Sequence, residues 1–266
     1  MRQWPVIAAL LIGVAYAAAA PTNAGLVEAE VKKVEAAPAP DAALPLDLGF
    51  LDETGRALTL REAIGSLPSV LVFADYTCRM LCGPVLEFTG AGLAKSGLKP
   101  DADYRLVVIG IDPRDKLAAA QAMRAQHMDD GSPISRAAVF LTGDEGAIRS
   151  VAQAVGLHYY YDAEHDQYAH PAAVYVVDAE GRVRRVLSPL GLDGSDLRLA
   201  IVDAGRGAVG TLADRIHLLC YGYDPVKGIY TERITRMLAF AAGLTLLALL
   251  GGISLMAMRE RRGLRS

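Results

Sequence analysis

The order of strand-like and helix-like segments limits what this chain can fold into more than any other feature of its sequence. Apolar runs of strand length alternate with longer segments of helical composition through the middle of the chain. The predicted strands cover residues 70–73, 104–111 and 137–141, and the predicted helices cover residues 61–67, 85–95, 115–128, 144–155, 197–204 and 210–219. Such alternation is typical of an α/β sheet whose parallel strands are joined by crossover helices. Hairpins with turns at residues 52–55 and 178–181 add antiparallel strands, so we predict a central mixed sheet flanked by helices.

Two cysteines, Cys78 and Cys82, follow the first of these strands and precede the first long helix. On a helical or near-helical turn they face the same way, with Cβ atoms roughly 5–6 Å apart. This spacing suits chelation of one metal ion, or a disulfide after a small backbone adjustment. Pro84 fits the first turn of the helix, because its missing N–H would be an unsatisfied donor there. Cys82 then lies near a helix N-terminus, where the partial positive charge favours a thiolate.

A reactive cysteine pair at the strand-to-helix turn of an α/β unit is the thioredoxin-like arrangement, and we expect that fold here. Arg79 stands between the two thiols. Its charge would lower the pKa of the thiols if it faced them, and the alternative is a solvated side chain. A purely structural disulfide is another alternative, although it would close a very small loop and contribute little stability.

Two apolar segments near the ends of the chain predict its topology. Residues 4–20 form an alanine-rich apolar run behind Arg2, which is typical of a secretory signal peptide, with an uncleaved N-terminal anchor as the alternative. Residues 237–258 contain no charge and, at about 1.5 Å per residue, are long enough to cross a ~30 Å hydrocarbon core. Four arginines follow, at Arg259, Arg261, Arg262 and Arg265, as expected for a cytoplasmic flank. We therefore expect a single-pass C-terminal anchor in the inner membrane, with the preceding domain on the periplasmic side.

The chain divides accordingly into a signal peptide (1–20), an Ala- and Pro-rich linker (21–45), a thioredoxin-like domain (46–205), a juxtamembrane segment (206–236), a transmembrane helix (237–258) and a cytoplasmic tail (259–266). The net charge of −3 comes with no basic stripe, which argues against a nucleic-acid partner. Three cysteines are too few for a disulfide scaffold. Because an oxidising compartment would oxidise the pair, we expect a thiol reductant as a partner.

Several further motifs resemble one known family. They are Gly110-Ile-Asp-Pro113, Leu141-Thr-Gly-Asp144, Tyr168-Ala-His170-Pro-Ala-Ala-Val-Tyr-Val-Val-Asp178 and Cys220-Tyr-Gly-Tyr-Asp-Pro-Val-Lys-Gly228. Together with the cysteine pair, they make residues 44–230 similar to the Sco/SenC proteins, which are thioredoxin-fold copper chaperones of cytochrome c oxidase assembly. The last motif, with a transmembrane helix behind it, resembles a bacterial branch of that family.

The resemblance implies that Cys78, Cys82 and His170 bind copper. Two thiolates and one imidazole form a soft site that suits Cu(I) and can also hold Cu(II). The implied partners are the cytochrome c oxidase subunit that carries the dinuclear copper site, and a thiol reductant or another copper chaperone. We further expect the peptide bond between His170 and Pro171 to be cis, because thioredoxin-like folds often place a cis-proline in the loop that faces the cysteines.

The sequence departs from the family pattern at four positions. Arg79 stands where a proline commonly follows the first cysteine, and Gly83 follows the second. Ala169 replaces an acidic residue, and Gly222 occupies a place where the bacterial branch has a histidine. These differences leave the three implied ligands intact. They bear on which client the protein serves and on how tightly it binds copper.

The remaining histidines and the third cysteine have simpler interpretations. His127, His158, His165 and His217 are expected to be solvated or hydrogen-bonded, although His165 lies in the acidic run 162–166 and is a candidate auxiliary metal contact. A satisfied structural histidine is also the alternative for His170. Cys220, in an apolar stretch before the membrane, is expected to be an inert buried thiol, with intermolecular pairing as the alternative.

Three other functions remain open from the sequence. In a thiol–disulfide reductase, Cys78 and Cys82 would be the catalytic redox pair: Cys78 would attack a client disulfide, Cys82 would resolve the mixed disulfide, and His170 would be dispensable. A peroxide-scavenging enzyme usually has Pro and Thr at set distances before its cysteine, whereas Thr77 is directly adjacent to Cys78 here. A redox or copper sensor is the third alternative.

Overall fold

The computed structural model describes residues 34–189, 192–205, 209–211, 214, 221–224, 229–232, 243–247, 249 and 251. Its helices are α2 (Leu60–Ile64), α3 (Cys82–Ser96), α4 (Leu117–His127), α5 (Pro133–Ala137), α6 (Glu145–Ala154) and α7 (Gly194–Ala204). Its strands are β1 (Gly49–Asp52), β2 (Ala57–Thr59), β3 (Ser69–Ala74), β4 (Arg105–Gly110), β5 (Val139–Thr142), β6 (Tyr160–Asp162), β7 (Gln167–Ala169), β8 (Val174–Val177), β9 (Val183–Leu187), β10 (Tyr221–Asp224) and β11 (Ile229–Glu232).

Seven strands form the central sheet, in the order β2-β1-β5-β4-β3-β8-β9. The three inner strands β3, β4 and β5 are parallel, and the hairpins β1–β2 and β8–β9 add antiparallel strands at the two sides. All residues of β3 are buried, as expected for a parallel strand covered on both faces. The predicted mixed α/β sheet is therefore confirmed.

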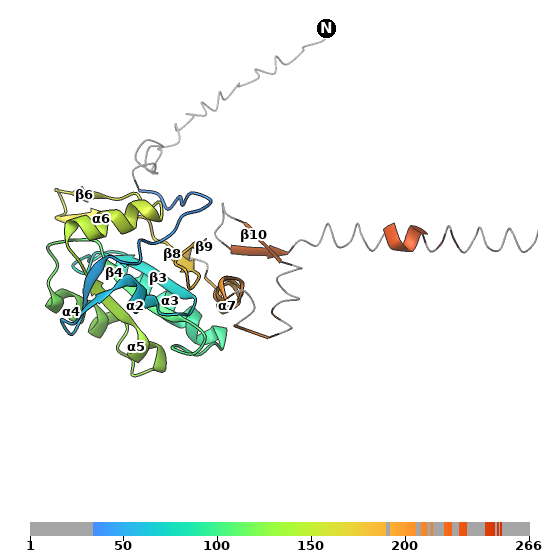
Figure 1. Ribbon diagram of the computed structural model, residues 1–266, viewed down its shortest axis with the longest axis horizontal. Coiled ribbons are helices and arrows are strands. Elements are labelled where there is room, and N and C mark those ends of the chain that lie inside the picture. The colour runs from blue at the N-terminus through green and yellow to red at the C-terminus, as the bar shows by residue number, and fades with distance from the viewer. Residues whose placement is uncertain are drawn as a thin grey trace, which may run out of the picture.

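Helices cover both faces of this sheet and enclose two apolar cores. On one face, side chains of α3, α4 and α7 pack against Val70, Val72 and Val108. On the other, side chains of α2 and α6 pack against Leu71, Phe73 and Ile109. Figure 1 shows β3 and β4 lying between α6 and α3. Alternate residues of each inner strand thus point into different cores.

The connection from β3 to α3 carries the two cysteines. β3 ends at Ala74, and α3 begins at Cys82 rather than at residue 85, so that Pro84 lies in its first turn as predicted. α3 ends at Gly97, whose left-handed φ of 69° suits glycine. Because the carboxyl ends of parallel strands share one edge of a sheet, the loops after β3 and β4 meet at this edge.

The sequence did not predict the antiparallel hairpin β10–β11, and two elements of the main domain were also not predicted. One is the short helix α5, which begins with Pro133 after the N-cap Ser132. The other is the small antiparallel hairpin β6–β7, which lies outside the main sheet. Its Tyr161 and Tyr168 rings lie 5.3 Å apart between centroids, and the Tyr159 ring lies 5.6 Å from that of Tyr168. The residue after β7 is His170, so this hairpin brings a predicted ligand to the sheet edge.

The predicted terminal segments are described only in part. The signal peptide lies outside the described residues, and the predicted linker is described from residue 34, where backbone bridges join Ala36 to Leu157 and Ala43 to Arg182. Most of residues 237–258 and of the predicted helix 210–219 also lie outside them. Among the described residues, no helix has the length and apolar character needed to span a membrane.

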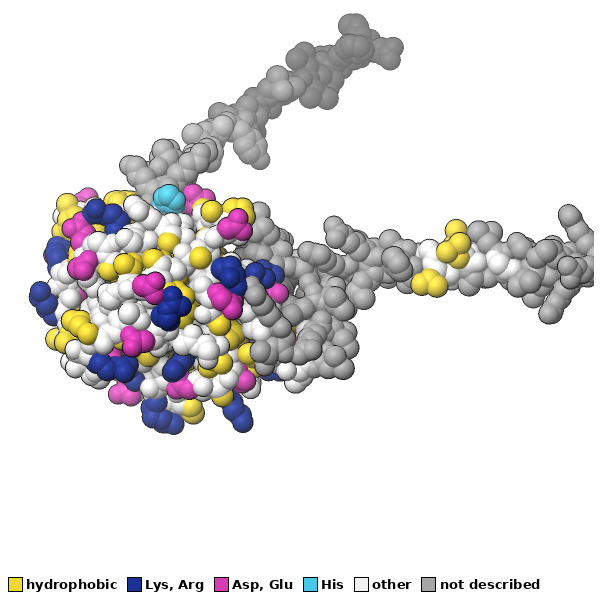
Figure 2. All heavy atoms as spheres, viewed as in Figure 1, with side chains coloured by type: hydrophobic (Ala, Val, Ile, Leu, Met, Phe, Trp, Pro, Cys, Tyr) yellow, Lys and Arg dark blue, Asp and Glu magenta, His cyan; other side chains and the backbone are white. Residues whose placement is uncertain are grey.

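Charged side chains of both signs are interspersed over the face of the domain that Figure 2 shows.

Candidate metal centre

The cysteine turn, residues 75–82, places two thiols of different exposure at the sheet edge. Cys82 is the first residue of α3 and is 3% exposed, whereas Cys78 is partly buried. The Cys78 amide donates to the Asp75 carbonyl at 3.1 Å, and the Met80 amide donates to Cys78 Sγ at 3.4 Å. Both cysteines are free thiols. The turn therefore keeps one sulfur near the surface and the other against the core.

His170 lies against the buried thiol. Its Nε2 is 3.2 Å from Cys82 Sγ, although the two residues are 88 positions apart in the chain. Its Nδ1 is 3.1 Å from the carbonyl oxygen of Pro171. A carbonyl only accepts hydrogen bonds, so Nδ1 carries the proton and the Nε2 lone pair faces Cys82. Burial lowers the pKa of His170, which favours this neutral form.

The prediction of a cis peptide bond between His170 and Pro171 was wrong, because the described residues contain no cis peptide bond. Residues 170–173 separate β7 from β8. This length of chain lets the imidazole turn toward Cys82 with a trans bond.

The sequence predicted that Cys82 would be the thiolate, but the structure lowers the pKa of Cys78 and raises that of Cys82. A hydrogen bond from Cys82, with further bonds from backbone groups at residues 80–82, lowers the pKa of Cys78 to about 5. The same hydrogen bond to Cys78, together with burial, raises the pKa of the Cys82 thiol. The helix N-terminus does not make Cys82 the thiolate, because burial of this sulfur disfavours the charged form. Cys78 is thus the thiolate of the pair.

A small cavity joins these groups. It has a volume of about 150 Å³, and Cys78, Met80, Cys82 and His170 are among the residues that line it. This volume is below the roughly 300–1,000 Å³ of typical small-molecule sites. A larger hollow of about 740 Å³ lies beside β1 and β2 and shares none of these residues. The cavity at the cysteines is therefore smaller than a typical organic-ligand site, and its lining includes the two thiols and the imidazole.

The three predicted ligands are close together but do not form a closed site. Among the described residues, the trio whose ligand atoms all lie within 4.8 Å of one another is Asp75, Asp112 and Asp115, and not the two cysteines with His170. Cys82 and His170 are already in contact. Since metal–ligand bonds are about 2.0–2.3 Å long, an ion at Cys82 and His170 would have to draw the more exposed Cys78 inward.

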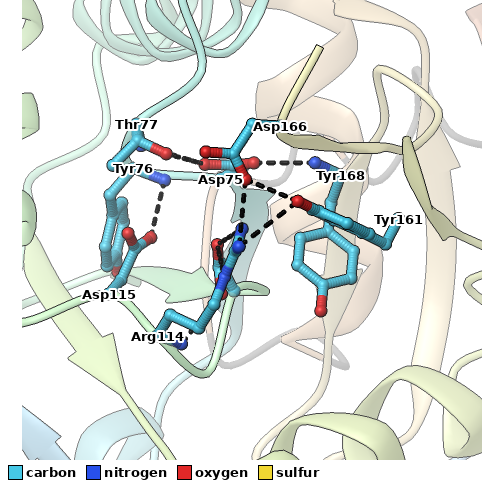
Figure 3. Close-up of polar contacts among 9 residues, drawn as sticks. Asp75, Tyr76, Thr77, Arg114, Asp115, Tyr161, Asp166 and Tyr168 are labelled. Atoms are coloured by element: carbon cyan, nitrogen blue, oxygen red, sulfur yellow. Dashed lines mark hydrogen bonds and ion pairs between the residues drawn. The ribbon is translucent and has the colours of Figure 1, made fainter. Parts of the chain in front are cut away.

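A polar network behind the cysteine turn was not predicted from the sequence. Figure 3 shows the Asp75 carboxylate between Thr77 and Tyr168, and it accepts hydrogen bonds from both. Nearby, the Arg114 guanidinium contacts Asp112 and Asp166 and lies 4.8 Å from the centre of the Tyr161 ring. The Asp-x-Thr spacing in the sequence is typical of a turn, but it carries no signal for a contact with β7.

Other candidate histidines have carboxylate partners, and the His127 ring also packs against Gly83, the residue after Cys82. His165 Nδ1 is 2.7 Å from Asp162, which raises the pKa of His165, and His127 Nδ1 is 2.8 Å from Glu87. Arg79 is exposed and lines a groove with Asp112 and Asp166. Cys220 and His217 lie outside the residues whose side chains are described.

Comparison with known proteins identifies one family. A family model described as SCO1/SenC matches residues 38–198. No curated protein sequence matches the chain.

Three solved structures illustrate the likeness in fold. A putative electron transfer protein from Aquifex aeolicus is 18% identical, with a TM-score of 0.53 over 66% of this chain and 98% of its own. BsSco, for which a disulfide switch is described, is a member of the Sco family of cytochrome c oxidase assembly proteins; it is 19% identical, with a TM-score of 0.51 over 65% of this chain and 99% of its own. Yeast Sco1 with copper bound is 18% identical, with a TM-score of 0.50 over 67% of this chain and 95% of its own.

Proposed function

The chain belongs to the SCO1/SenC family, and from this premise we propose that it is an extracytoplasmic copper chaperone whose cargo is held by Cys78, Cys82 and His170. The contact of 3.2 Å between Cys82 Sγ and His170 Nε2 is the observation that carries the proposal. It joins a soft sulfur ligand to an unprotonated imidazole nitrogen in a small cavity that Cys78 also lines. Thiolate and imidazole together suit Cu(I) and tolerate Cu(II). The copper bound to yeast Sco1 supports the choice of metal.

The acidities of the thiols suggest an order of events for uptake of the cargo. Cys78 is the thiolate and the more exposed sulfur, so it meets an incoming copper ion first. Cys82 then loses its proton as it becomes a ligand, because a thiol must be deprotonated to bind metal. His170 needs no proton release, since its Nε2 is already free. Delivery proceeds by ligand exchange, in which a client ligand first replaces the more exposed Cys78.

The proposed client rests on the family, and the proposed location rests on the sequence. The client proposed is the cytochrome c oxidase subunit that carries the dinuclear copper site, and the description of BsSco as a member of an oxidase assembly family supports it. A thiol reductant or another copper chaperone would keep Cys78 and Cys82 reduced and loaded. The apolar run 237–258 would anchor the chain in the inner membrane, with the domain on the periplasmic side.

An anaerobic Cu(I) titration of the reduced full-length chain against a competing chelator tests the ligand set. We expect one copper per chain, and an affinity at least about tenfold lower for Cys78→Ser, Cys82→Ser and His170→Ala, since each removes a metal ligand. His158→Ala is the matched control, because His158 lines a different hollow beside α6 and does not line the cavity at the cysteines. Weak binding that is indifferent to His170 would contradict the proposal.

One observation favours thiol–disulfide reductase activity as a second candidate. Hydrogen bonds lower the pKa of Cys78 to about 5, which is typical of an attacking cysteine in a redox pair. This function predicts that the metal-free chain reduces a model disulfide, and that His170→Ala retains the activity while Cys78→Ser loses it. Failure of copper-free reduction by the unmodified chain would exclude it.

A further inference from the structure

Asp75 makes more hydrogen bonds than its local turn requires. It is fully buried at the start of the cysteine turn. Its Oδ1 accepts from the Thr77 amide at 2.9 Å and from the Thr77 hydroxyl at 2.8 Å. These bonds close a local turn of the kind that Asp commonly makes with the residue two positions ahead. They occupy one carboxylate oxygen and leave the other available.

Asp52 provides an internal comparison. In the β1–β2 turn, its Oδ1 accepts from the Thr54 amide at 3.0 Å and from the Thr54 hydroxyl at 2.6 Å, which is the same local pattern. Its Oδ2 accepts from Arg56 Nε at 3.0 Å, within the same hairpin. The second oxygen of Asp52 therefore serves only its own turn.

The second oxygen of Asp75 makes a distant contact instead. Oδ2 accepts from the Tyr168 amide at 2.8 Å, across 93 positions in the chain. Tyr168 lies in β7, two residues before His170. Asp75 itself begins the turn that ends at Cys82. One buried carboxylate thus joins the segment that carries the buried thiol to the segment that carries the imidazole, as Figure 3 shows for Thr77, Asp75 and Tyr168.

We propose that Asp75 is a positioning residue of the metal centre, which sets the separation of Cys82 and His170 by holding β7 against the cysteine turn. The proposal rests on the proposed function, since it concerns the same copper site. Asp75 is not a ligand in it, because its oxygens are already bonded to Thr77 and Tyr168.

The chemistry requires a carboxylate at this position. Both hydrogen-bond partners of Asp75, Thr77 and Tyr168, are donors, and a carboxylate can accept on both oxygens. An asparagine keeps the size of the side chain but offers one acceptor and one NH₂ donor. If its oxygen keeps the turn, its NH₂ group faces the Tyr168 N–H, so the link to β7 is lost. Asp75→Asn therefore separates the two roles of the side chain.

The β6–β7 hairpin is also attached through Arg114, so the effect of Asp75→Asn should be confined to one end of it. Arg114 pairs with Asp166 at 3.0 Å and with the buried Asp112 at 2.6 Å, and it lies over the Tyr161 ring. Asp166 is in the turn between β6 and β7, at the end of the hairpin away from His170. Loss of the Asp75 bond thus leaves β6 and the turn attached, and it frees the end of β7 that leads to His170.

Two measurements on the full-length chain in detergent test the proposal. The first is amide hydrogen exchange of the metal-free protein, in which Asp75→Asn should speed exchange at Tyr168 by at least about tenfold, because that amide loses its acceptor. The second is Cu(I) titration of Asp75→Asn, His170→Ala and the double variant. Asp75→Asn should lower the affinity by about tenfold alone and by less than about twofold in the His170→Ala background, since it acts through His170. Asp52→Asn is the matched control, and it should change neither Tyr168 exchange nor copper affinity.

The outcomes separate this inference from the proposed function. Unchanged Tyr168 exchange in Asp75→Asn, or an unchanged affinity for copper, would overturn the positioning role. An equal loss of affinity with and without His170 would also overturn it, because Asp75 would then act only on the thiols or on stability. If instead the unmodified chain binds copper no better than His170→Ala, the proposed function fails, whatever the hydrogen exchange shows.

Discussion

At the scale of single residues, the two cysteines differ in burial and in pKa, although their spacing in the sequence does not distinguish them. Cys82 is buried and its thiol pKa is raised, whereas Cys78 is more exposed and its thiol pKa is lowered. A single hydrogen bond therefore lowers the pKa of one thiol and raises that of the other. It makes Cys78 the sulfur that first meets a metal ion or a disulfide.

The pH dependence of Cys78 alkylation checks this assignment. The folded-state pKa of Cys78 is lowered from 9.0 to about 5, so its thiolate is present above about pH 5 and is lost as the pH falls through that value. We expect the rate of iodoacetamide labelling at Cys78, followed by peptide mass spectrometry, to be nearly constant between pH 6.5 and 8. Cys82→Ala removes the donor and should move the midpoint toward the ordinary thiol pKa of about 8.5. A rate that rises steadily with pH up to 9 in the unmodified chain would show that Cys78 is an ordinary thiol.

At the scale of elements, the site depends on how closely its strands and loops approach one another. Tyr76, in the cysteine turn, is buried beside β4 and donates its hydroxyl to the carbonyls of Val108 and Leu141. A Cβ atom at Gly110 would come within 2.7 Å of the Tyr76 ring and 3.2 Å of the Leu141 carbonyl. Gly110 therefore allows the cysteine turn to pack on the end of β4.

Gly110→Ala should destabilise the domain, because Tyr76 is enclosed and has little room to move away. Overpacking of this kind typically costs about 2 kcal/mol in the free energy of unfolding, measurable by urea denaturation. Gly49→Ala in β1 is the matched control, since a Cβ there meets nothing within 4 Å. Equal stability of the two variants would mean that the turn adjusts around Tyr76 at no cost.

Arg114 gives a second test at this scale. Arg114→Ala removes the pairs with Asp112 and Asp166, and the β6–β7 hairpin loses its attachment to the loop after β4. We expect amide exchange in residues 160–169 to become at least about threefold faster, while exchange in β3 and β4 stays the same. Arg149→Ala, which removes an exposed pair with Glu145 on α6, is the control and should leave the hairpin unchanged. Unaltered exchange in the hairpin of Arg114→Ala would show that the tyrosine packing and the Asp75–Tyr168 hydrogen bond hold it without Arg114.

At the scale of the whole molecule, a mixed α/β sheet supports a site at the carboxyl edge of its parallel strands. Membership of the SCO1/SenC family and the likeness to solved structures agree with a thioredoxin-like fold. The proposed signal peptide and anchor would place that edge in the periplasm.

The anchor makes a prediction of its own, based on the uncharged run 237–258. In a bacterial host, the full-length chain should stay in the membrane pellet after alkaline carbonate extraction, because a span of this length is held by the hydrocarbon core. A chain truncated after Arg236 should appear in the soluble periplasmic fraction. Recovery of the full-length chain in the soluble fraction would contradict the anchor.

The sequence by itself determined the elements and most of the candidate site. Apolar strand runs, the turn residues at 52–55 and 178–181, and Pro84 predicted the strands, hairpins and helix start that the structure has, because these signals act between residues a few positions apart. The hairpin β6–β7 escaped prediction because each of its strands has only three residues and none of these residues is buried. His170 became a candidate only through the family resemblance, since its local sequence carries no sign of a partner.

Only the tertiary structure decided which groups meet and which thiol keeps its proton. The contact of Cys82 with His170 spans 88 positions and that of Asp75 with Tyr168 spans 93, so both depend on the packing of the whole sheet. The helix N-terminus favoured a thiolate at Cys82, but burial and the hydrogen bond to Cys78 outweighed it. Burial and long-range hydrogen bonds are properties of the folded chain, and no local pattern in the sequence encodes them.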